Sequence, residues 1–513
     1  MKSIRKWRVQ TVLLVTSLAM MLSACAATGG AEQVLPEMGK DEQATIKVTY
    51  WDEESFFRDL GNLFLVQHPN IDIEVVSTNR IYKEGKDPME AMKEFIEEEQ
   101  PDVLMLDTYN IKKLIDEGML YPLDPVIAQD EFDLEGILPA AIEAIRKSGD
   151  GKLYGLAPTF YSSALYYNKS LFDKHGVPLP SDGMTWAEVL QLAERFPKDG
   201  SEKDRIYGLE LPGFGGGNDS WRLMQMGAER GLSYVDPSAG KVTLNTDSWK
   251  EAANLVLKLS KSEAMFKHDP NKQSQQFKSH EDFLLRDPFI GGRVAMKIDG
   301  MHLMRELREA TDVLKEKFTV DWDIVTVPVH PENPTVSSSF GIHQIYGINA
   351  KSQNLRAAWE FVKYINSDTM ARVTARAPVW GGLPVRTEYI RNEEGKHLEA
   401  FYALEPSTTD TYSAYRELPQ SFNQQFHGIV SKHWENVVNE KVTVDEALAS
   451  IETEAQAALD QALEEEAAKK DGKADEGGQA GGAEAEPESS EDQPAAAEGD
   501  SATTEAQPAA QSE

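Results

Sequence analysis

Hydrophobic and polar residues alternate at the start of the globular part of the chain, and this pattern predicts strands. Ile46, Val48 and Tyr50 are separated by polar residues, which is the period of a half-buried strand. The apolar positions that begin at Phe56 recur at helical spacing, and alternation resumes at Ile71. A strand, a helix and a strand in succession predict an α/β protein.

Later segments repeat this order of strands and helices. The continuous apolar run Val103–Leu106 is typical of a strand buried on both faces of a parallel sheet. Asp87 and Pro88 mark a helix start, with proline at the first helical position. The pattern also predicts strands at 294–300 and 322–327, helices from Ile111 to Gly118 and from Leu355, and two helices that open with the capping boxes Thr185–Glu188 and Thr443–Glu446. We therefore expect layered α/β architecture with right-handed crossovers.

The N-terminus has the pattern of an export signal. Basic residues between Lys2 and Arg8 precede an apolar run, Val12–Leu22, that is shorter than the ~20 residues needed to span a bilayer. The next residues, Leu22-Ser23-Ala24-Cys25, resemble a bacterial lipobox, in which Cys25 is acylated and becomes the new first residue. A free cysteine behind an ordinary signal peptide is the alternative. Two or more acyl chains would hold the protein on a membrane stably.

Composition limits the classes of partner. The 513-residue chain is long enough for two or more domains, and its formal net charge of -33 argues against nucleic acid as a partner. The single cysteine excludes an internal disulfide. Between Asp471 and Glu513, twelve acidic residues and one lysine contribute -11 of the -33, and large apolar residues are almost absent. This segment is expected to be disordered because it cannot bury enough surface to offset the entropy of ordering.

The sequence shows no strong catalytic or metal motif. The glycine-rich run 213–217 is not followed by Gly-Lys-Ser/Thr, so it does not predict a phosphate loop. The ten histidines lack metal-ligand spacing. The adjacent carboxylates of Asp52, Glu53 and Glu54 could belong to a glycosidase, which needs two carboxyl groups ~5–9 Å apart, but they also suit an acidic helix N-terminus. We therefore expect no enzymatic activity, cofactor or metal.

Several segments, in order along the chain, resemble bacterial extracellular solute-binding proteins of family 1. The segments are Pro101-Asp102-Val103, Asp150-Gly151-Lys152-Leu153-Tyr154-Gly155-Leu156-Ala157-Pro158, Leu165-Tyr166-Tyr167-Asn168-Lys169-Ser170-Leu171-Phe172, Gly292-Arg293-Val294-Ala295-Met296 before Asp299-Gly300, Tyr346-Gly347-Ile348-Asn349 before Arg356-Ala357-Ala358-Trp359-Glu360-Phe361, and Gly382-Leu383-Pro384-Val385. Each segment alone is a weak match, but the ordered set covers nearly the whole globular part. Members of this family are the capture subunits of ABC importers, and many bind sugars.

The resemblance implies a two-lobed periplasmic-binding-protein-like fold of type II, with the ligand cleft between lobes joined by crossing strands. By similarity, the chain would cross near Thr159, near 341–346 and near Gly381, and ligand would close the lobes by a hinge motion. The implied organisation is a signal peptide at 1–24, a lipidated tether at 25–44, lobe 1 at 45–158 and 346–380, lobe 2 at 159–345 and 381–466, and a disordered acidic tail at 467–513. Such a long acidic tail is not a feature of the family.

Aromatic and polar residues near strand ends are the candidate ligand-binding residues, because flat aromatic faces and fixed polar groups suit a ring-shaped polar solute. They are the aromatic residues Trp51, Tyr109, Tyr161 and Trp380 and the polar residues Asp52, Asp107, Asp299 and His302. Many family members carry Trp at the position of His302, so the usual stacking platform is replaced here. Trp186, Trp249 and Trp359 lie in amphipathic patterns, and we assign them to the core.

These observations together predict a membrane-anchored, extracytoplasmic binding protein. We expect it to capture a mono- or oligosaccharide and to deliver it to the permease subunits of an ABC importer. Two alternatives remain open from the sequence. One is a surface glycoside hydrolase, and the other is a ligand-sensing lipoprotein that feeds a membrane kinase.

Overall fold

The structure is a computed structural model that describes residues 35–39, 41–81, 87–201, 204–211, 219–268, 277–337, 339–342, 344–376, 382–392, 395–407, 415–416 and 418–476. The predicted signal peptide, Cys25, the glycine-rich run 213–217 and Trp380 lie outside the described residues. The chain divides into two compact units, Met1–Asp460 and Gln461–Glu513. The two five-stranded sheets described below belong to the first unit.

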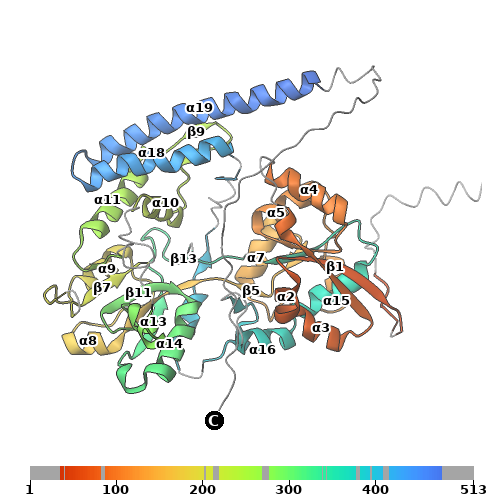
Figure 1. Ribbon diagram of the computed structural model, residues 1–513, viewed down its shortest axis with the longest axis horizontal. Helices are drawn as coiled ribbons and strands as arrows, with labels where there is room; N and C mark the ends of the chain where they lie inside the picture. Colours follow the sequence, from red (N-terminus) through yellow and green to blue (C-terminus); the bar gives the residue numbers. More distant parts are fainter. Residues whose placement is uncertain are drawn as a thin grey trace, which may run out of the picture. The chain divides into compact units, whose positions relative to one another are not determined.

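Lobe 1 is built on a five-stranded sheet in the order β2-β1-β3-β14-β4 (Figure 1). Its strands are β1 (Ala44–Tyr50), β2 (Ile71–Ser77), β3 (Val103–Leu106), β4 (Gly155–Leu156) and β14 (Ile345–Ile348). β1 runs parallel to β2 and β3, whereas β14 is antiparallel to β3 and β4. The expected parallel sheet is therefore wrong on the β14 side of β3, where the neighbouring strand is antiparallel. The reason is that β14 enters at the edge where β3 and β4 end, because Ile345 pairs with Leu106.

Helices cover both faces of this sheet, and α2, α4 and α5 each begin at an aspartate whose side chain caps them. They are α2 (Glu53–Phe56), a π-helical segment (Phe57–Gly61), α3 (Asn62–Gln67), a 3-10 turn (Thr78–Arg80), α4 (Pro88–Glu99), α5 (Thr108–Asp116), α6 (Asp124–Gln129), α7 (Pro139–Ser148), α15 (Leu355–Ile365) and α16 (Asp368–Arg376). Asp87 caps α4 as predicted. Asp107 caps α5 by accepting the backbone N–H of Asn110 at 2.7 Å, so this helix begins before the predicted Ile111.

Lobe 2 contains a second five-stranded mixed sheet, in the order β10-β7-β11-β6-β12. Its strands are β6 (Ser163–Asn168), β7 (Tyr207–Glu210), β10 (Met265–Phe266), β11 (Val294–Gly300) and β12 (Trp322–Thr326), which confirms the predicted strands at 294–300 and 322–327. β6 runs antiparallel to both neighbours, and Ala164 pairs with Asp299 on one side and with Thr326 on the other. The carboxyl ends of β11 and β12 therefore meet the start of β6 at one edge.

Further helices and two short ribbons complete the described chain. The helices are α8 (Lys169–His175), α9 (Trp186–Ala193), α10 (Asp219–Glu229), α11 (Asp247–Lys261), α13 (His280–Arg286), α14 (Met301–Leu314) with a 3-10 turn (Lys315–Lys317), α18 (Gln420–Val438) and α19 (Val444–Glu476), and the ribbons are β8 (Val235–Asp236) with β9 (Lys241–Val242) and β13 (Val336–Ser337) with β16 (Glu405–Pro406). Both predicted capping boxes are present at Thr185 and Thr443. α19 continues to Glu476, so the first residues of the predicted disordered tail are helical, because alanine, glutamate and lysine are strong helix formers.

Two paired segments cross between the lobes. β5 (Thr159–Phe160) pairs antiparallel with β15 (Leu383–Pro384), and two 3-10 turns follow β15 at Thr387–Tyr389 and Leu398–Phe401. Tyr161 exchanges backbone hydrogen bonds of 2.8 and 2.9 Å with Gly341. Two α/β lobes joined by crossing strands are the architecture that the sequence predicts.

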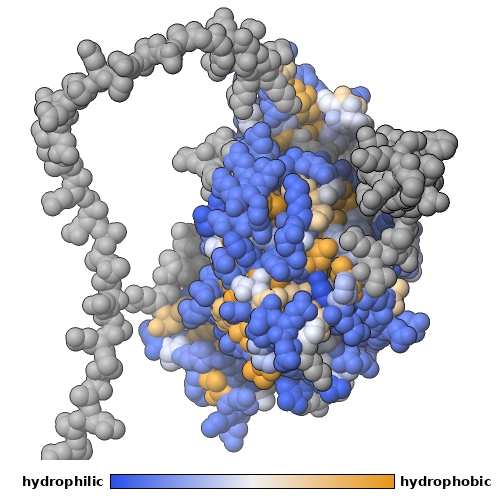
Figure 2. All heavy atoms as spheres, turned by 90° about the vertical axis from the view of Figure 1, so that its right-hand side faces the viewer, coloured by the Kyte–Doolittle hydropathy of each residue, from blue (hydrophilic) through white to orange (hydrophobic). Residues whose placement is uncertain are grey.

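The described surface is largely hydrophilic on the face that Figure 2 shows, and its hydrophobic residues lie in small groups. No helix among the described residues is long and apolar enough to cross a bilayer. Exposed large hydrophobic side chains are few, and one of them, Trp221, is 62% exposed. An exposed tryptophan of this kind is informative about function where it lies beside a cavity.

Candidate functional site

Four predicted residues lie at one edge of the lobe-1 sheet. Trp51 and Asp52 follow β1, while Asp107 and Tyr109 follow β3. These neighbouring strands are parallel, so their carboxyl ends share an edge, and ligands of open α/β sheets bind at that edge. The geometry brings the four residues into one region, and their contact with a solute stays a prediction.

Asp52 and Trp51 already have structural partners. Asp52 accepts the backbone N–H of Ser55 at 2.8 Å as the N-cap of α2, and this hydrogen bond holds the pKa of Asp52 below its ordinary value. The ring of Trp51 contacts Tyr50 edge-on at 4.7 Å, and its carbonyl accepts the hydroxyl of Ser77. An acidic helix start therefore accounts for the carboxylate cluster at this point.

Asp107 and Tyr109 are covered by an arginine from the C-terminal part of the chain. Nη1 of Arg416 donates to Oδ2 of Asp107 at 3.1 Å, and its guanidinium lies 4.6 Å from the centre of the Tyr109 ring. Tyr415 and Arg416 precede α18, which packs against α10 and α11 of lobe 2. Arg416 thus joins lobe 2 to two candidate ligand residues of lobe 1.

Asp299 lies at the end of β11 in a buried charge cluster. Its carboxylate is 3.3 Å from Nζ of Lys297 and 3.0 Å from Nε2 of His302. Lys297 also contacts Glu210 at 3.5 Å and makes a short ion pair with Asp287. Burial disfavours the ammonium, but the three carboxylates outweigh burial and raise the pKa of Lys297. Lys297 is therefore a permanent cation that pairs with Asp299 and helps to hold its side chain in place.

A cavity of about 410 Å³ opens beside the carboxyl ends of β11 and β12. We call it the lobe-2 cavity. Of the predicted site residues that the structure describes, Asp299 lines this cavity. Side chains that can stack or hydrogen-bond make up much of the remaining wall, and they are Ser163, Trp186, Trp221, Arg222, Gln225, Glu229, Arg230, His330, Ser337 and Ser339.

The wall of the lobe-2 cavity combines an aromatic face with a titratable acid. Nε1 of Trp186 donates to Oε2 of Glu229 at 3.1 Å, and burial raises the pKa of Glu229 to about 7. Trp186 is buried, as predicted, but it also contributes to the cavity. Trp249 and Trp359 are buried at 2% and 0% exposure, which confirms their assignment to the core.

Sequence reasoning missed Trp221, although a signal for it exists. Leu223 and Met226 of α10 are fully buried and define the apolar stripe of this helix. Trp221 does not belong to that stripe, since two residues correspond to about 200° of helical rotation. A tryptophan outside the apolar stripe of a helix is not needed for core packing, and at the wall of a cavity its ring is available to pack against a ligand.

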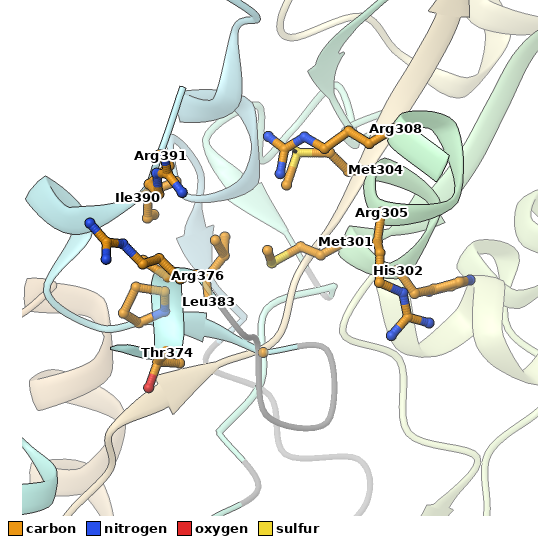
Figure 3. Close-up of a pocket in the computed structure, with 13 residues that line it drawn as sticks. Met301, His302, Met304, Arg305, Arg308, Thr374, Arg376, Leu383, Ile390 and Arg391 are labelled. Atoms are coloured by element: carbon orange, nitrogen blue, oxygen red, sulfur yellow. Dashed lines mark hydrogen bonds between the residues drawn. The ribbon is translucent and has the colours of Figure 1, made fainter. Parts of the chain in front are cut away.

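The other predicted residues that the structure describes do not line the lobe-2 cavity. Tyr161 is half-buried on a crossing segment, and burial raises the pKa of its hydroxyl. His302 lines a second cavity, of about 520 Å³, whose described walls are α14 and residues 374–376, 382–384 and 390–391 (Figure 3). No group of three or more His, Cys, Asp or Glu side chains within the described ranges is placed to hold a metal ion.

Comparison with known proteins identifies the family. Residues 50–372 match the family described as bacterial extracellular solute-binding protein. A Brucella abortus protein, named as a binding protein without a stated ligand, is 25% identical over 418 residues, which are 79% of this chain and 88% of that protein. The arabinooligosaccharide-binding protein of Bacillus subtilis is 22% identical over 248 residues, 48% of this chain and 52% of its own length.

The fold is shared with solved binding proteins. The sugar-binding protein MalE of Xanthomonas citri has a TM-score of 0.57 at 18% identity, covering 81% of this chain and 98% of that chain. A sugar transporter structure from Rhizobium etli, in an open conformation, has a TM-score of 0.56 at 20% identity, with 80% and 99% covered. These similarities confirm the predicted two-lobed type II fold. The chain belongs to the bacterial extracellular solute-binding protein family.

Proposed function

We propose that the protein is a lipid-anchored, extracytoplasmic binding protein that captures a carbohydrate and delivers it to the permease subunits of an ABC importer. It would bind its solute and release it without chemical change. The family supports the binding role, and the names of several relatives, which are sugar-binding proteins, support a carbohydrate as the solute.

The observation that carries this proposal is the lobe-2 cavity with Trp221 at its wall. Trp221 exposes 62% of its surface there, beside the side chains of Gln225 and Glu229. An aromatic face binds the apolar side of a sugar ring, and fixed polar groups pair with its hydroxyls. The candidates Trp51, Asp107, Asp299 and the other predicted residues are proposed to complete the site when the lobes close.

The lipid anchor is proposed from the lipobox that ends at Cys25. The basic and short apolar segments before it have the order of a signal peptide. Acylation of this one residue would keep the binding lobes beside the importer in the membrane. The predicted tether, residues 25–44, extends too far, because Leu35 is buried in the core and its backbone N–H donates to Oε1 of Gln129 at 3.0 Å. The proposed tether therefore precedes Leu35.

A thermal-shift screen against mono- and oligosaccharides, followed by calorimetry, tests the proposal. A ligand at 100 times its Kd should add ~2.7 kcal/mol of stability. Binding without turnover of chromogenic glycosides is the expected result. Turnover would replace the proposal with a glycoside hydrolase. Failure of every sugar to bind would refute carbohydrate capture, and unchanged sugar uptake after deletion of the gene would favour the sensor alternative.

A further inference from the structure

One side of α10 presents three different side chains to the lobe-2 cavity. Trp221, Gln225 and Glu229 follow one another at intervals of four residues, so they lie along the same side of the helix, and all three line the cavity. Leu223 and Met226 are fully buried on another side of the helix. The sequence of α10 therefore places an aromatic ring, an amide and a carboxyl group along one wall of the cavity.

The carboxyl group of Glu229 has one fixed oxygen and one accessible oxygen. Nε1 of Trp186 donates to Oε2 of Glu229 at 3.1 Å, and within the described part of the chain Glu229 makes no ion pair. The side chain keeps part of its surface exposed, and its Oε1 is not a buried atom. Because Glu229 lines the lobe-2 cavity, this second oxygen is accessible to a solute there.

The two arginines of α10 are directed at other groups. Nη1 of Arg222 donates to Oε1 of Gln225 at 2.8 Å, and Nη1 of Arg230 lies 3.5 Å from the carboxylate of Glu251 on α11. Burial outweighs the attraction of these arginines and raises the pKa of Glu229 to about 7. Glu229 is therefore a cavity residue that gains or loses its proton near neutral pH.

Other titratable side chains line the cavity or lie on helices that pack against α10. Asp299 of β11 lines the cavity and pairs with Lys297. The cations near the end of α18, Lys432 and His433, are directed to Glu454 of α19. His330 lines the same cavity, and its Nδ1 accepts the backbone N–H of Glu332 at 3.4 Å. A variant of His330 is therefore part of the test.

An ionised carboxylate with few partners is unfavourable in a partly buried place, so the accessible oxygen of Glu229 needs a hydrogen-bond donor. We propose that this oxygen accepts a hydroxyl hydrogen bond from the bound carbohydrate, and that capture of a neutral sugar therefore weakens as the medium becomes acidic. The inference rests on the proposed carbohydrate-binding function. A sugar stacked on Trp221 has its hydroxyl groups at the rim of the ring, and Glu229 lies farther along the same side of α10.

The direction of the pH dependence follows from proton linkage. A hydrogen bond to a charged acceptor is stronger than one to a neutral acceptor, so a sugar that donates to the carboxylate lowers the pKa of Glu229 and releases protons. Affinity should then rise roughly tenfold between about pH 5.5 and pH 8.5. A sugar that only covered the carboxyl group would favour its protonated form, and affinity would fall as pH rises.

Calorimetry on the wild-type protein makes the first test. The probes are neutral mono- and oligosaccharides, including arabinotriose and maltose, at about pH 5.5 and pH 8.5. The expected result is about tenfold tighter binding at the higher pH. Titrations at about pH 6.5 in two buffers of different ionisation enthalpy should also show release of about half a proton per bound sugar.

Variants assign the pH dependence to one residue. Glu229→Gln imitates the protonated acid, because its carbonyl can accept from Trp186 while its amide group donates, so it should bind at both pH values with the low-pH affinity of the wild type. Glu263→Gln is the matched control, since Glu263 is exposed and does not line the cavity, and it should keep the pH dependence. His330→Gln should also keep it, whatever its affinity. Circular dichroism shows whether each variant is folded.

The outcomes separate this inference from the carbohydrate proposal. If neutral sugars bind with an affinity that is flat or falls as pH rises, the inference is wrong and carbohydrate capture stands. The same holds if the pH dependence survives in Glu229→Gln or disappears in His330→Gln. Binding without proton release would contradict the inference even if Glu229→Gln did not fold. If no neutral sugar binds at either pH, the carbohydrate proposal fails and this inference fails with it.

Discussion

Nη1 of Arg416 lies 3.1 Å from Oδ2 of Asp107, and this ion pair joins the segment before α18 to the first turn of α5. Both side chains are partly exposed, at 21% and 31%, so the pair contributes little stability, on the order of 0.2–1 kcal/mol. The position of this ion pair is more informative than its contribution to stability, because Asp107 is also a candidate ligand residue. One carboxylate thus has a protein partner and a proposed solute partner.

The first prediction separates these two partners of Asp107. Asp107→Asn removes the charge but keeps a good N-cap for α5. If Asp107 contacts the solute, this change should weaken affinity roughly tenfold both in the wild type and in an Arg416→Gln background, as measured by calorimetry. A loss of affinity only where Arg416 is present would instead assign Asp107 to the link between the lobes.

Trp221 and Trp359 should respond in opposite ways to replacement by alanine. Trp221→Ala should weaken solute binding by ~1.5–3 kcal/mol through lost contact area, with little change in unfolding free energy, because its ring is exposed at the cavity. Trp359→Ala should cost ~3–5 kcal/mol of stability, because Trp359 is fully buried and donates to Asp130 at 2.9 Å. Denaturant melts and calorimetry on both variants check this. Full affinity of the Trp221 variant would remove that residue from the site.

Glu229 should make stability depend on pH. Burial raises its pKa from 4.5 to about 7, so the folded protein binds more protons than the unfolded chain between these values. The folding stability that the protonated side chain of Glu229 contributes is therefore fully present below pH 4.5 and is lost as pH rises through about 7. Glu229→Gln should match the wild type at pH 4 and exceed its stability by up to ~3 kcal/mol above pH 7.

The control for this prediction is another glutamate. Glu251→Gln makes the same chemical change at a side chain that is 70% exposed. Both variants are measured by urea melts from pH 4 to 9. A flat difference for Glu229→Gln would mean that its carboxyl group titrates normally in the folded protein.

Cys25→Ser tests the proposed anchor. The variant should lack acyl groups and move from the membrane fraction to the soluble fraction, because no other cysteine can replace Cys25. Mass spectrometry of the wild-type N-terminus checks the lipid, and Ser23→Ala serves as a control in the same segment. A membrane-bound variant together with an unmodified wild-type cysteine would contradict the anchor.

Local patterns in the sequence predicted much of the fold. β1 and β11 follow from alternation, and the helices that begin after Asp87, Thr185 and Thr443 follow from their caps. A cap or an alternating pattern depends on residues that are close together in the sequence, so it can be recognised without knowledge of the tertiary structure. The direction of β14 was not predictable from pattern, since it depends on the edge at which the returning chain enters the lobe-1 sheet.

The site was harder to predict than the fold. Trp51 and Asp107 follow β1 and β3, and the sequence correctly placed them at the same edge of the lobe-1 sheet, because adjacent parallel strands end at the same edge. The Arg416–Asp107 pair joins residues 309 positions apart, and periodicity carries no information at that separation.

The position of β14 in the lobe-1 sheet sets an order for folding during synthesis. β3 and β4 belong to the first third of the chain, but they meet only through Ile345–Ile348. A nascent fragment that ends before Ile345 exposes unpaired strand edges, which favour aggregation, and long-range pairing of this kind is slow. A chain that ends before this strand is therefore expected to remain accessible to chaperones, and truncated translation products are expected to aggregate more readily than the full chain.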